Sequence, residues 1–342
     1  MRVAVDAQLT VGTATGIGEY VTGLIAGLRD RGVDVVALCD PDSDPWRFDR
    51  RVIWDQFTLP RRARRSGAAL LHCASGTMPL TSPGMPSVAT VHDVAWFNAQ
   101  SHARPYARRY FGSFSLARYR TAAAVFVDSQ FSRTELLAVA NDLDPERVSV
   151  VYPGVAADFC NVVRGPGDGR TILVAGTVER RKNLEVVVRA LQSLPNARVI
   201  SAGPATPYRE ECEALAASLG VSDRVEYRGY VSREQLLDLY ARCAVVAVPS
   251  RYEGFGYTLA QALCAGAPCI AGNAASLPEV AGGDAPLLPV DDVAAWSRAL
   301  ERALAGECDE RAATVRGRAI ARLGWSASLD RVLDAYRLVA GA

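Results

Sequence analysis

The chain has 342 residues, 49% of them hydrophobic and 22% charged, and its formal net charge is +1. This composition is that of a globular protein. It excludes collagen-like, coiled-coil and largely disordered chains, and the charge balance argues against a nucleic-acid binder. The length exceeds what one core usually serves, so two domains are expected. The basic residues are unusual, because 37 of the 38 are arginine and Lys182 is the single lysine.

Eight cysteines are scattered along the chain without a Cys-x-x-Cys pair, which favours buried, reduced thiols over disulfides. The three histidines, His72, His92 and His102, lack metal-ligand spacing, so no metal site is expected. No signal-peptide core opens the chain, and no run reaches the roughly 18 to 20 apolar residues of a membrane span. We therefore expect a cytoplasmic protein.

Positive charge is concentrated between residues 46 and 120, where twelve arginines stand against three aspartates, a balance of +9. Such a surface suits phosphate, an anionic acceptor or the anionic inner face of a membrane. Arginines that are solvated on helix faces, or paired with acids elsewhere in the fold, explain the pattern equally well. A peripheral membrane contact through this region therefore stays open.

In chain order, the first half alternates short β-branched runs with helical patterns. The runs predict strands at residues 3–6, 33–39, 69–72, 87–91, 124–128 and 147–151. A Gly-rich loop follows the first strand, and helices are expected near residues 18–31, 105–122 and 129–140. Continuous apolar strands separated by helices predict a parallel sheet that is covered on both faces.

Residues 161–170 are rich in glycine and lack periodicity, which predicts a linker. Beyond it, strands are expected at 171–176, 197–203, 224–229 and 244–250, with helices between them and a helical tail from about 291. The domains should be residues 1–160 and 161–325, both Rossmann-like and doubly wound, with a helix at 326–342 packing back toward the first. Such sheets bind ligands at the carboxyl ends of strands, so a site in the cleft between the domains is expected.

Two segments of the second half carry the chemistry. In GTVERRKN (176–183), Gly176 permits a tight turn, and Arg181 and Lys182 place two cations at a helix start, which suits a diphosphate. Because every other basic residue of the chain is arginine, the lysine at this position indicates that a compact ammonium is needed there. In PSRYEGFGYTLAQALCAGAPCI (249–270), a Gly-rich turn opens a helix whose free N–H groups can receive phosphate or sugar oxygens.

Two further residues have a structural and a functional interpretation. Glu253 precedes the second helix, where it either complements the helix dipole or holds ligand hydroxyls. His92 ends a buried strand beside Asp93, and it is either a structural residue or part of a site. The other two histidines, His72 and His102, are expected to be structural.

Together with GYVSREQL (229–236) and SLPEVAGG (276–283), these segments resemble the donor-binding half of the retaining glycosyltransferases of family 4, the glycosyl transferases group 1, which have the GT-B fold. The first half is similar to the same family at TGIGEY (15–20), VHD (91–93), DSQFS (128–132) and YPGV (152–155). The resemblance covers nearly the whole chain. It implies two Rossmann-like domains that face each other across a cleft.

The resemblance further implies a metal-independent, cofactor-free hexosyltransferase with a nucleotide-diphospho-sugar donor. Arg181 and Lys182 are then expected to bind the diphosphate, Glu253 to contact the sugar and His92 to position it. Donor contacts are implied for Gly16, Gly18, Gly176, Gly254, Phe255, Gly256, Gln261, Ser276, Leu277 and Glu279. GDP-mannose is favoured over UDP- and dTDP-sugars, because TGIGEY is similar to loops of mannosyltransferases. A saccharide, lipid-linked or small-molecule acceptor should enter through the first half.

Gln261 departs from the family pattern, which has a second glutamate there to hold the ribose, so altered nucleotide binding is implied. Two alternatives stay open. An NAD(P)-dependent oxidoreductase is suggested by Gly16, Gly18 and Asp40, although Val21 stands where a third glycine is needed. A non-catalytic GT-B partner subunit is suggested only by Gln261.

Overall fold

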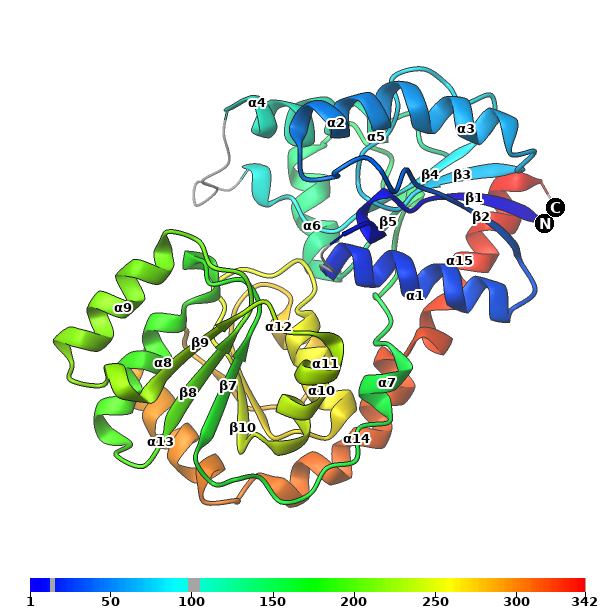
Figure 1. The fold of residues 1–342 in the computed structure, drawn as a ribbon. Helices are drawn as coiled ribbons and strands as arrows, with labels where there is room; N and C mark the ends of the chain where they lie inside the picture. The colour runs from blue at the N-terminus through cyan, green and yellow to red at the C-terminus, as the bar shows by residue number, and fades with distance from the viewer. Residues whose placement is uncertain (13–15, 98–104, 342) are drawn as a thin grey trace. The chain divides into compact units, whose positions relative to one another are not determined.

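In the computed structural model, the described part of the chain comprises residues 1–12, 16–97 and 105–341. The chain forms two compact units (Figure 1). The first unit runs to Gly154 and resumes at Trp325, and the second comprises Val155–Gly324. From the sequence these divisions are expected after residues 160 and 325, slightly later in the chain in both cases. The two places where the chain passes between the units are linked by a hydrogen bond. Val155 N, at the start of the second unit, donates to Leu323 O near its end (2.8 Å).

The first unit contains a parallel six-stranded sheet in the order β2-β1-β3-β4-β5-β6. Its strands are β1 (Arg2–Asp6), β2 (Asp34–Leu38), β3 (Leu70–Cys73), β4 (Ser87–Val91), β5 (Ala124–Val127) and β6 (Val148–Val150). The central strands are buried on both faces, which explains their continuous apolar sequences. All six strand predictions for this half are confirmed to within two residues.

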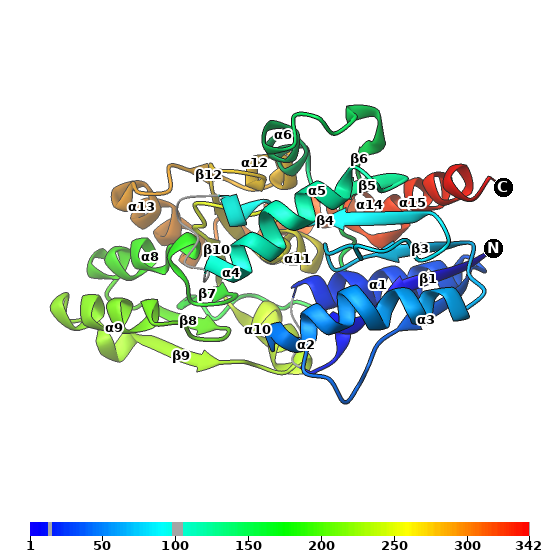
Figure 2. The same cartoon turned by 90° about the horizontal axis from the view of Figure 1, so that it is seen from above.

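Helices cover both faces of this sheet, with α1 and α15 on one side and α2, α3 and α5 on the other (Figure 1). Their bounds are α1 (Gly16–Asp30), α2 (Phe48–Ile53), α3 (Leu59–Arg65), α4 (Pro105–Ala107), α5 (Ser115–Tyr119), α6 (Gln130–Val139) and α15 (Trp325–Ala340). The π-helical segments η2 (Trp54–Thr58) and η4 (Arg108–Phe114) join α2 to α3 and α4 to α5. Figure 2 shows α2 and α3 running on from one another as one helix, which the sequence analysis did not predict.

The last helix belongs to the first unit because two glycines of α1 give it room. A Cβ at Gly23 would lie 2.1 Å from Trp325 Nε1, and one at Gly27 would lie 2.5 Å from Leu329 Cδ1. The two helices therefore approach more closely than larger side chains allow. His72 on β3 reaches the same helix, since its Nδ1 lies 2.5 Å from the hydroxyl of Tyr336.

The second unit repeats the architecture, with a parallel sheet in the order β12-β11-β10-β7-β8-β9. Its strands are β7 (Thr171–Ala175), β8 (Arg198–Ala202), β9 (Val225–Gly229), β10 (Val245–Val248), β11 (Cys269–Gly272) and β12 (Leu287–Leu288). Its helices are α7 (Ala157–Cys160), α8 (Leu184–Ala190), α9 (Tyr208–Ser218), α10 (Arg233–Arg242), α11 (Tyr257–Ala265), α12 (Leu277–Ala281), α13 (Val293–Leu304) and α14 (Asp309–Leu323). Figure 1 shows α8, α9 and α13 on one face of the sheet and α10, α11 and α14 on the other.

The predicted linker at residues 161–170 is an ordered part of the second unit. It contains neither helix nor strand, but the Arg164 guanidinium donates to the carbonyl oxygens of Tyr240 and Cys243, at 2.6 Å each. Asp168 Oδ1 accepts from the Thr171 N–H at the start of β7 (2.7 Å). The segment is therefore fixed to the second sheet.

Two other expectations concern thiols and membranes. All eight cysteines are free; five are buried, and Cys39, Cys160 and Cys308 are partly exposed. Among the described helices, none combines the length and the apolar character that crossing a bilayer demands.

Each sheet has a point where the chain reverses its direction of winding, between β1 and β3 in the first unit and between β7 and β10 in the second. The loops that leave neighbouring strands diverge at such a switch point, and ligands bind there at the carboxyl ends of the strands. These two places are therefore the candidate positions of a functional site.

Candidate functional site

The loops that follow β7 and β10 meet at the switch point of the second sheet. Arg251 N donates to Arg181 O (2.7 Å), and the amide of Asn183 donates to Pro249 O (3.1 Å). Asn183 has a left-handed backbone (φ 56°), which ends the short 3-10 turn η6 (Arg180–Lys182) and starts α8. The two predicted cations therefore lie on a separate turn before the helix rather than in its first turn.

The loop contacts bring the predicted cations and the predicted acid together. Lys182 Nζ lies 2.6 Å from Glu253 Oε1, and Arg181 Nη1 lies 3.1 Å from Glu253 Oε2. The other terminal nitrogen of Arg181, Nη2, lies 2.7 Å from an oxygen of Glu179. Gly176 lies beside this arrangement, where its φ of 118° is one that residues with a Cβ rarely adopt; a Cβ there would be in ordinary van der Waals contact with Lys182 Cε, at 3.6 Å. Two carboxylates thus alternate with two cations at the switch point.

Glu253 is a buried carboxylate with a strongly lowered pKa. Its Oε1 also accepts from the hydroxyl of Ser250 (2.8 Å). Burial by itself raises the pKa of Glu253, but the charges of Lys182 and Arg181 outweigh it and lower the pKa to about 2. The group is therefore ionised at neutral pH, and it holds both cations in place.

Residues at the start of α12 fix the Gly-rich turn after Glu253. The hydroxyl of Ser276 lies 2.9 Å from Glu253 O and 2.7 Å from Phe255 O. Gly256 has φ 100°, and a Cβ there would lie 2.8 Å from Cδ2 of the fully buried Leu277. Ser276 and Leu277 thus shape the site by holding its backbone.

Two predicted nucleotide-binding residues lie on neighbouring helices. Gln261 is buried on α11, and its Oε1 lies 3.1 Å from the hydroxyl of Tyr240 on α10. The carbonyl that was expected to accept from a ribose hydroxyl is therefore already contacted by a protein donor. Glu279 is partly exposed on α12.

In the first unit, His92 follows β4 and pairs with Asp128 after β5. Its Nδ1 lies 2.8 Å from Asp128 Oδ2, and its Nε2 lies 2.9 Å from Ala74 O. A carbonyl oxygen only accepts, so Nε2 carries a proton. Burial opposes the charged imidazole, but Asp128 and the two hydrogen bonds raise the pKa of His92 above its ordinary value. Both ring nitrogens are engaged within the unit, so the ring positions its loop.

The remaining residues that the sequence singled out in the first unit are two glycines and two histidines. Gly16 and Gly18 lie in the first turn of α1 instead of in a loop, because the helix begins at Gly16. His72 is fully buried between Thr90 and Tyr336, and burial lowers its pKa to about 3; these surroundings agree with the structural role expected of it. His102 lies outside the described residues.

One buried cluster at the first switch point was missed by the sequence analysis. Arg51 Nε donates to Asp55 Oδ2 (2.9 Å), and its Nη2 donates to Ser75 and Thr77 (2.6 Å each), beside Asp6 at the end of β1. Burial raises the pKa of Asp55. Arg51 belongs to the basic region at residues 46–120, and its pairing with Asp55 fits the alternative of arginines paired with acids in the fold. Nothing in the local sequence distinguishes it from the exposed arginines nearby.

The described residues contain no group of three or more His, Cys, Asp or Glu side chains arranged to hold a metal ion.

Two family models together match most of the chain. Residues 14–159 match the model described as Glycosyltransferase Family 4. Residues 161–322 match the model described as Glycosyl transferases group 1. The boundary between the two matches falls close to the first crossing between the structural units.

Curated relatives match to different extents. A D-inositol 3-phosphate glycosyltransferase from Mycobacterium avium (strain 104) is 30% identical over 397 residues, covering 97% of this chain and 91% of the relative. One from Mycolicibacterium smegmatis is 31% identical over 232 residues, and there the chain spans only about half of the relative's length, 52%. The O-antigen chain mannosyltransferase B of Escherichia coli is 28% identical, covering 74% of this chain and 70% of that protein.

Solved structures resemble the whole chain in fold. A sucrose-phosphate synthase from Thermosynechococcus elongatus matches with a TM-score of 0.78 and 22% identity over 100% of both chains. The Anabaena protein HepE, in complex with UDP and glucose, matches with a TM-score of 0.74 and 16% identity over 98% of this chain and 99% of its own. At these identities the likeness concerns the fold alone.

Proposed function

The chain belongs to glycosyltransferase family 4, the glycosyl transferases group 1, with a GT-B fold, and we propose that it transfers a hexose from a nucleotide-diphospho-sugar with retention of anomeric configuration. The observation that carries the proposal is the pair of cations, Arg181 and Lys182, that Glu253 holds at the second switch point. Preorganised charge of this kind stabilises a leaving group best, because it needs no rearrangement during the reaction.

In the proposed reaction, the bond between the anomeric carbon and the diphosphate oxygen breaks while the acceptor oxygen bonds to the same face of that carbon. The acceptor's proton passes to the departing diphosphate. Arg181 and Lys182 neutralise the charge that develops there, which is the task a metal ion performs in other enzymes. We therefore propose a metal-independent transfer that needs no bound cofactor.

Glu253 is proposed to hold a sugar hydroxyl and not to attack the anomeric carbon. A carboxylate has about four acceptor sites. The contacts of Glu253 with Lys182, Arg181 and Ser250 use three of them. One site remains for a sugar hydroxyl, and the strong ion pairs make the carboxylate a poor nucleophile.

The donor nucleotide is the least constrained part of the proposal. GDP-mannose stays the favoured donor, and the name of the E. coli relative, a mannosyltransferase, supports it. UDP-sugars are the second choice, since HepE was solved with UDP and glucose. The contact between Gln261 and Tyr240 predicts a weaker hold on the ribose than a glutamate provides.

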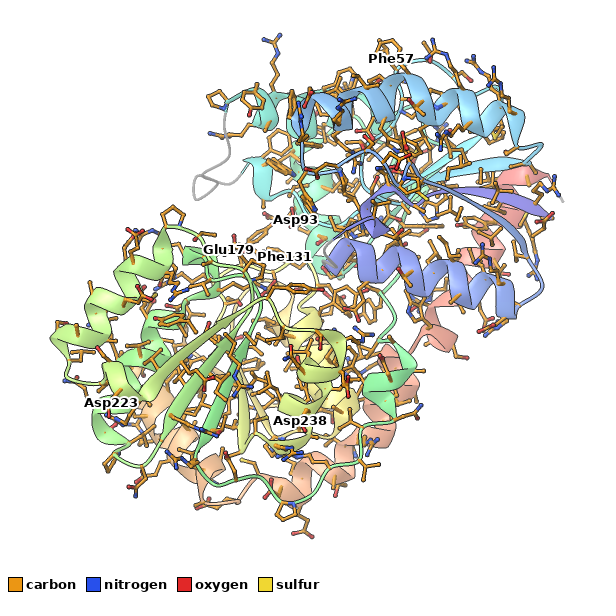
Figure 3. The ribbon with its side chains drawn as sticks, in the orientation of Figure 1. Phe57, Asp93, Phe131, Glu179, Asp223 and Asp238 are labelled. Carbon is orange, nitrogen blue, oxygen red and sulfur yellow. The ribbon has the colours of Figure 1, made fainter. Side chains whose placement is uncertain are left out.

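A saccharide, lipid-linked or small-molecule acceptor is proposed to bind the first unit, and the outer side of α2–α3 supports a lipid-linked one. Ile53 and Phe57 expose 49% and 52% of their surface there, and Leu80 of the loop after β3, whose N–H donates to Gln56 of the same helical segment, exposes 59%. Arg50 and Arg61 in the same helical segment are exposed, and the Arg61 guanidinium lies over the Phe57 ring, 5.7 Å from its centroid. Figure 3 shows Phe57 pointing outward from the unit. Apolar side chains among arginines suit an anionic lipid surface, which agrees with a cytoplasmic protein at the inner membrane face.

Sedimentation with vesicles tests this membrane contact. Binding should require anionic lipid and weaken in Phe57→Ser, while Tyr230→Ser, which removes an equally exposed aromatic ring from the second unit, should bind as the wild type does. Binding that is independent of anionic lipid or of Phe57 removes the membrane proposal and leaves the transferase proposal intact.

The experiment that tests the main proposal is a calorimetric screen against GDP, UDP, dTDP, ADP and NAD. Binding of one nucleoside diphosphate, followed by its release from the matching sugar donor when acceptors are added, supports a transferase. Binding of NAD alone supports the oxidoreductase alternative, which leaves Lys182 and Glu253 without a role. Nucleotide binding without release across a donor and acceptor panel supports the non-catalytic subunit.

A further inference from the structure

The two carboxylates that contact Arg181 have different surroundings. Glu253 is buried and is held by Lys182 and Ser250 as well as by Arg181. Glu179 has 31% of its side chain exposed and stands in extended backbone (φ −141°, ψ 157°) just before the 3-10 turn. Figure 3 shows Glu179 at the edge of the second unit, near the end of β7. One carboxylate is therefore built into the site, and the other stands at its rim.

The Arg181 guanidinium contacts both carboxylates, each through a different terminal nitrogen. Nη1 donates to Tyr252 O and Glu253 Oε2, both at 3.1 Å, which anchors the side chain to the β10 loop. Nη2 lies 2.7 Å from Glu179 Oε1. A guanidinium bound through one nitrogen can exchange the partner of the other without moving, because its donors form a rigid, planar fork.

We propose that Glu179 is an internal anion that occupies Arg181 when no donor is bound and that the diphosphate of the donor displaces. The inference rests on the proposed function, since it takes the ligand to be a diphosphate. A partly exposed carboxylate such as Glu179 moves into water at little cost, whereas Glu253 loses three contacts if it moves. Glu179 is thus the carboxylate that leaves Arg181 when the diphosphate binds.

This exchange sets how tightly the site holds any diphosphate. The side chains of Glu179, Arg181, Lys182 and Glu253 sum to zero charge, so the site is neutral until Glu179 moves away. The incoming diphosphate must compete for Nη2 and also meets the repulsion of a nearby like charge. After transfer, the returning carboxylate competes with the nucleoside diphosphate and promotes its release.

Calorimetry with inorganic pyrophosphate and with the four nucleoside diphosphates tests the proposal on the full chain. Glu179→Gln should bind the preferred diphosphate about threefold more tightly, or more, at low ionic strength, as expected for removal of a partly exposed ion pair. The matched control is Glu211→Gln, which removes the same charge from the partner of the adjacent Arg180. It should change the affinity much less. Circular dichroism and the Tm establish that both variants are folded.

Each outcome has one meaning. If Glu179→Gln binds with unchanged or weaker affinity, Glu179 does not compete for Arg181, and the inference is wrong. If Glu211→Gln tightens binding equally, the effect is a general one of net charge, and the inference is also wrong. If the wild type binds no diphosphate at all, it is the proposed function that fails. In turnover, Glu179→Gln should lower KM without raising kcat.

Discussion

Lys182 Nζ lies 2.6 Å from Glu253 Oε1, although 70 residues separate these two side chains along the chain. The single lysine of the sequence is therefore not a solvated residue at a helix start. It lies on the turn after β7 and pairs with Glu253 in the loop after β10. The ion pair therefore holds the two loops together. A lysine ends in one compact ammonium, which suits this confined position.

Lys182→Ala should lower kcat by about 100-fold or more while the protein stays folded, as removal of a preorganised charge at a leaving group does in other enzymes. Lys182→Arg should also impair transfer, because a planar guanidinium does not place its charge where the compact ammonium lies against Glu253 Oε1. Steady-state kinetics with the identified donor measures both. Arg180→Ala is the control, since that exposed arginine pairs with Glu211. A fully active Lys182→Arg would contradict the argument.

Acid should destabilise the wild type partly through Glu253. Its pKa is lowered to about 2 in the fold, so the stability that it contributes is present above its ordinary pKa, near 4.5, and is lost as the pH falls from there toward 2. Glu253→Gln should abolish this part of the acid dependence. It should also be less stable at pH 7 by about 1–3 kcal/mol, because two partly buried cations lose their partner.

Thermal and urea unfolding between pH 3 and pH 7 measure this difference. Glu211→Gln, whose ion pair is exposed, should follow the wild-type profile. Equal acid sensitivity of Glu253→Gln and the wild type would show that the carboxylate is not held as a charged group.

His92 and His72 should titrate at widely different pH values. Asp128 raises the pKa of His92 despite burial, whereas burial lowers that of His72 to about 3. Stability from the His92 pair is thus complete below the ordinary histidine pKa and is lost as the pH rises through the raised value. NMR of the imidazole nitrogens between pH 4 and pH 9 measures this, with a His102→Gln variant to assign the third signal. Asp128→Asn should lower the pKa of His92; an unchanged value would show that the pair is not ionic.

Gly256→Ala should reduce both stability and donor binding. Its φ of 100° is strained for any residue with a Cβ, and that Cβ would lie 2.8 Å from Leu277. We expect a loss of about 2 kcal/mol or more. Gly283→Ala is the matched control, because Gly283 also has a positive φ (83°) but open space around it. Urea unfolding separates strain, which the two share, from the clash, which only Gly256→Ala creates. Equal losses would show that the contact with Leu277 is unimportant.

Much of the fold could be predicted from local patterns. The six strands of the first sheet and β7 to β10 of the second were located because central parallel strands are continuous apolar runs, and such runs are visible without any tertiary information. The two-residue edge strand β12 was not predicted, because it is too short to form such a run. The segment from Phe48 to Arg65 was not predicted as a helix. Its π-helical turn at Trp54–Thr58 interrupts the regular period, and its outer side exposes both apolar and basic side chains.

Parts of the site were also visible in the sequence. Arg181, Lys182, Glu253 and the glycines stand at the ends of predicted strands, and parallel strands bring such ends to one edge of a sheet. Glu179 was not singled out, although it is adjacent to the predicted cations. A charged residue beside other charged residues carries no signal until its contacts are known.

The sequence by itself determined the fold class, the two alternating halves and the residues that come to the carboxyl edge of the second sheet, because these depend on local periodicity and on strand ends. The tertiary structure alone decided which charges meet. It paired Lys182 with Glu253, engaged both nitrogens of His92, and buried Arg51 while similar arginines stayed exposed. Such contacts join loops that are distant in sequence, and their energies depend on distance and burial, which no local pattern records.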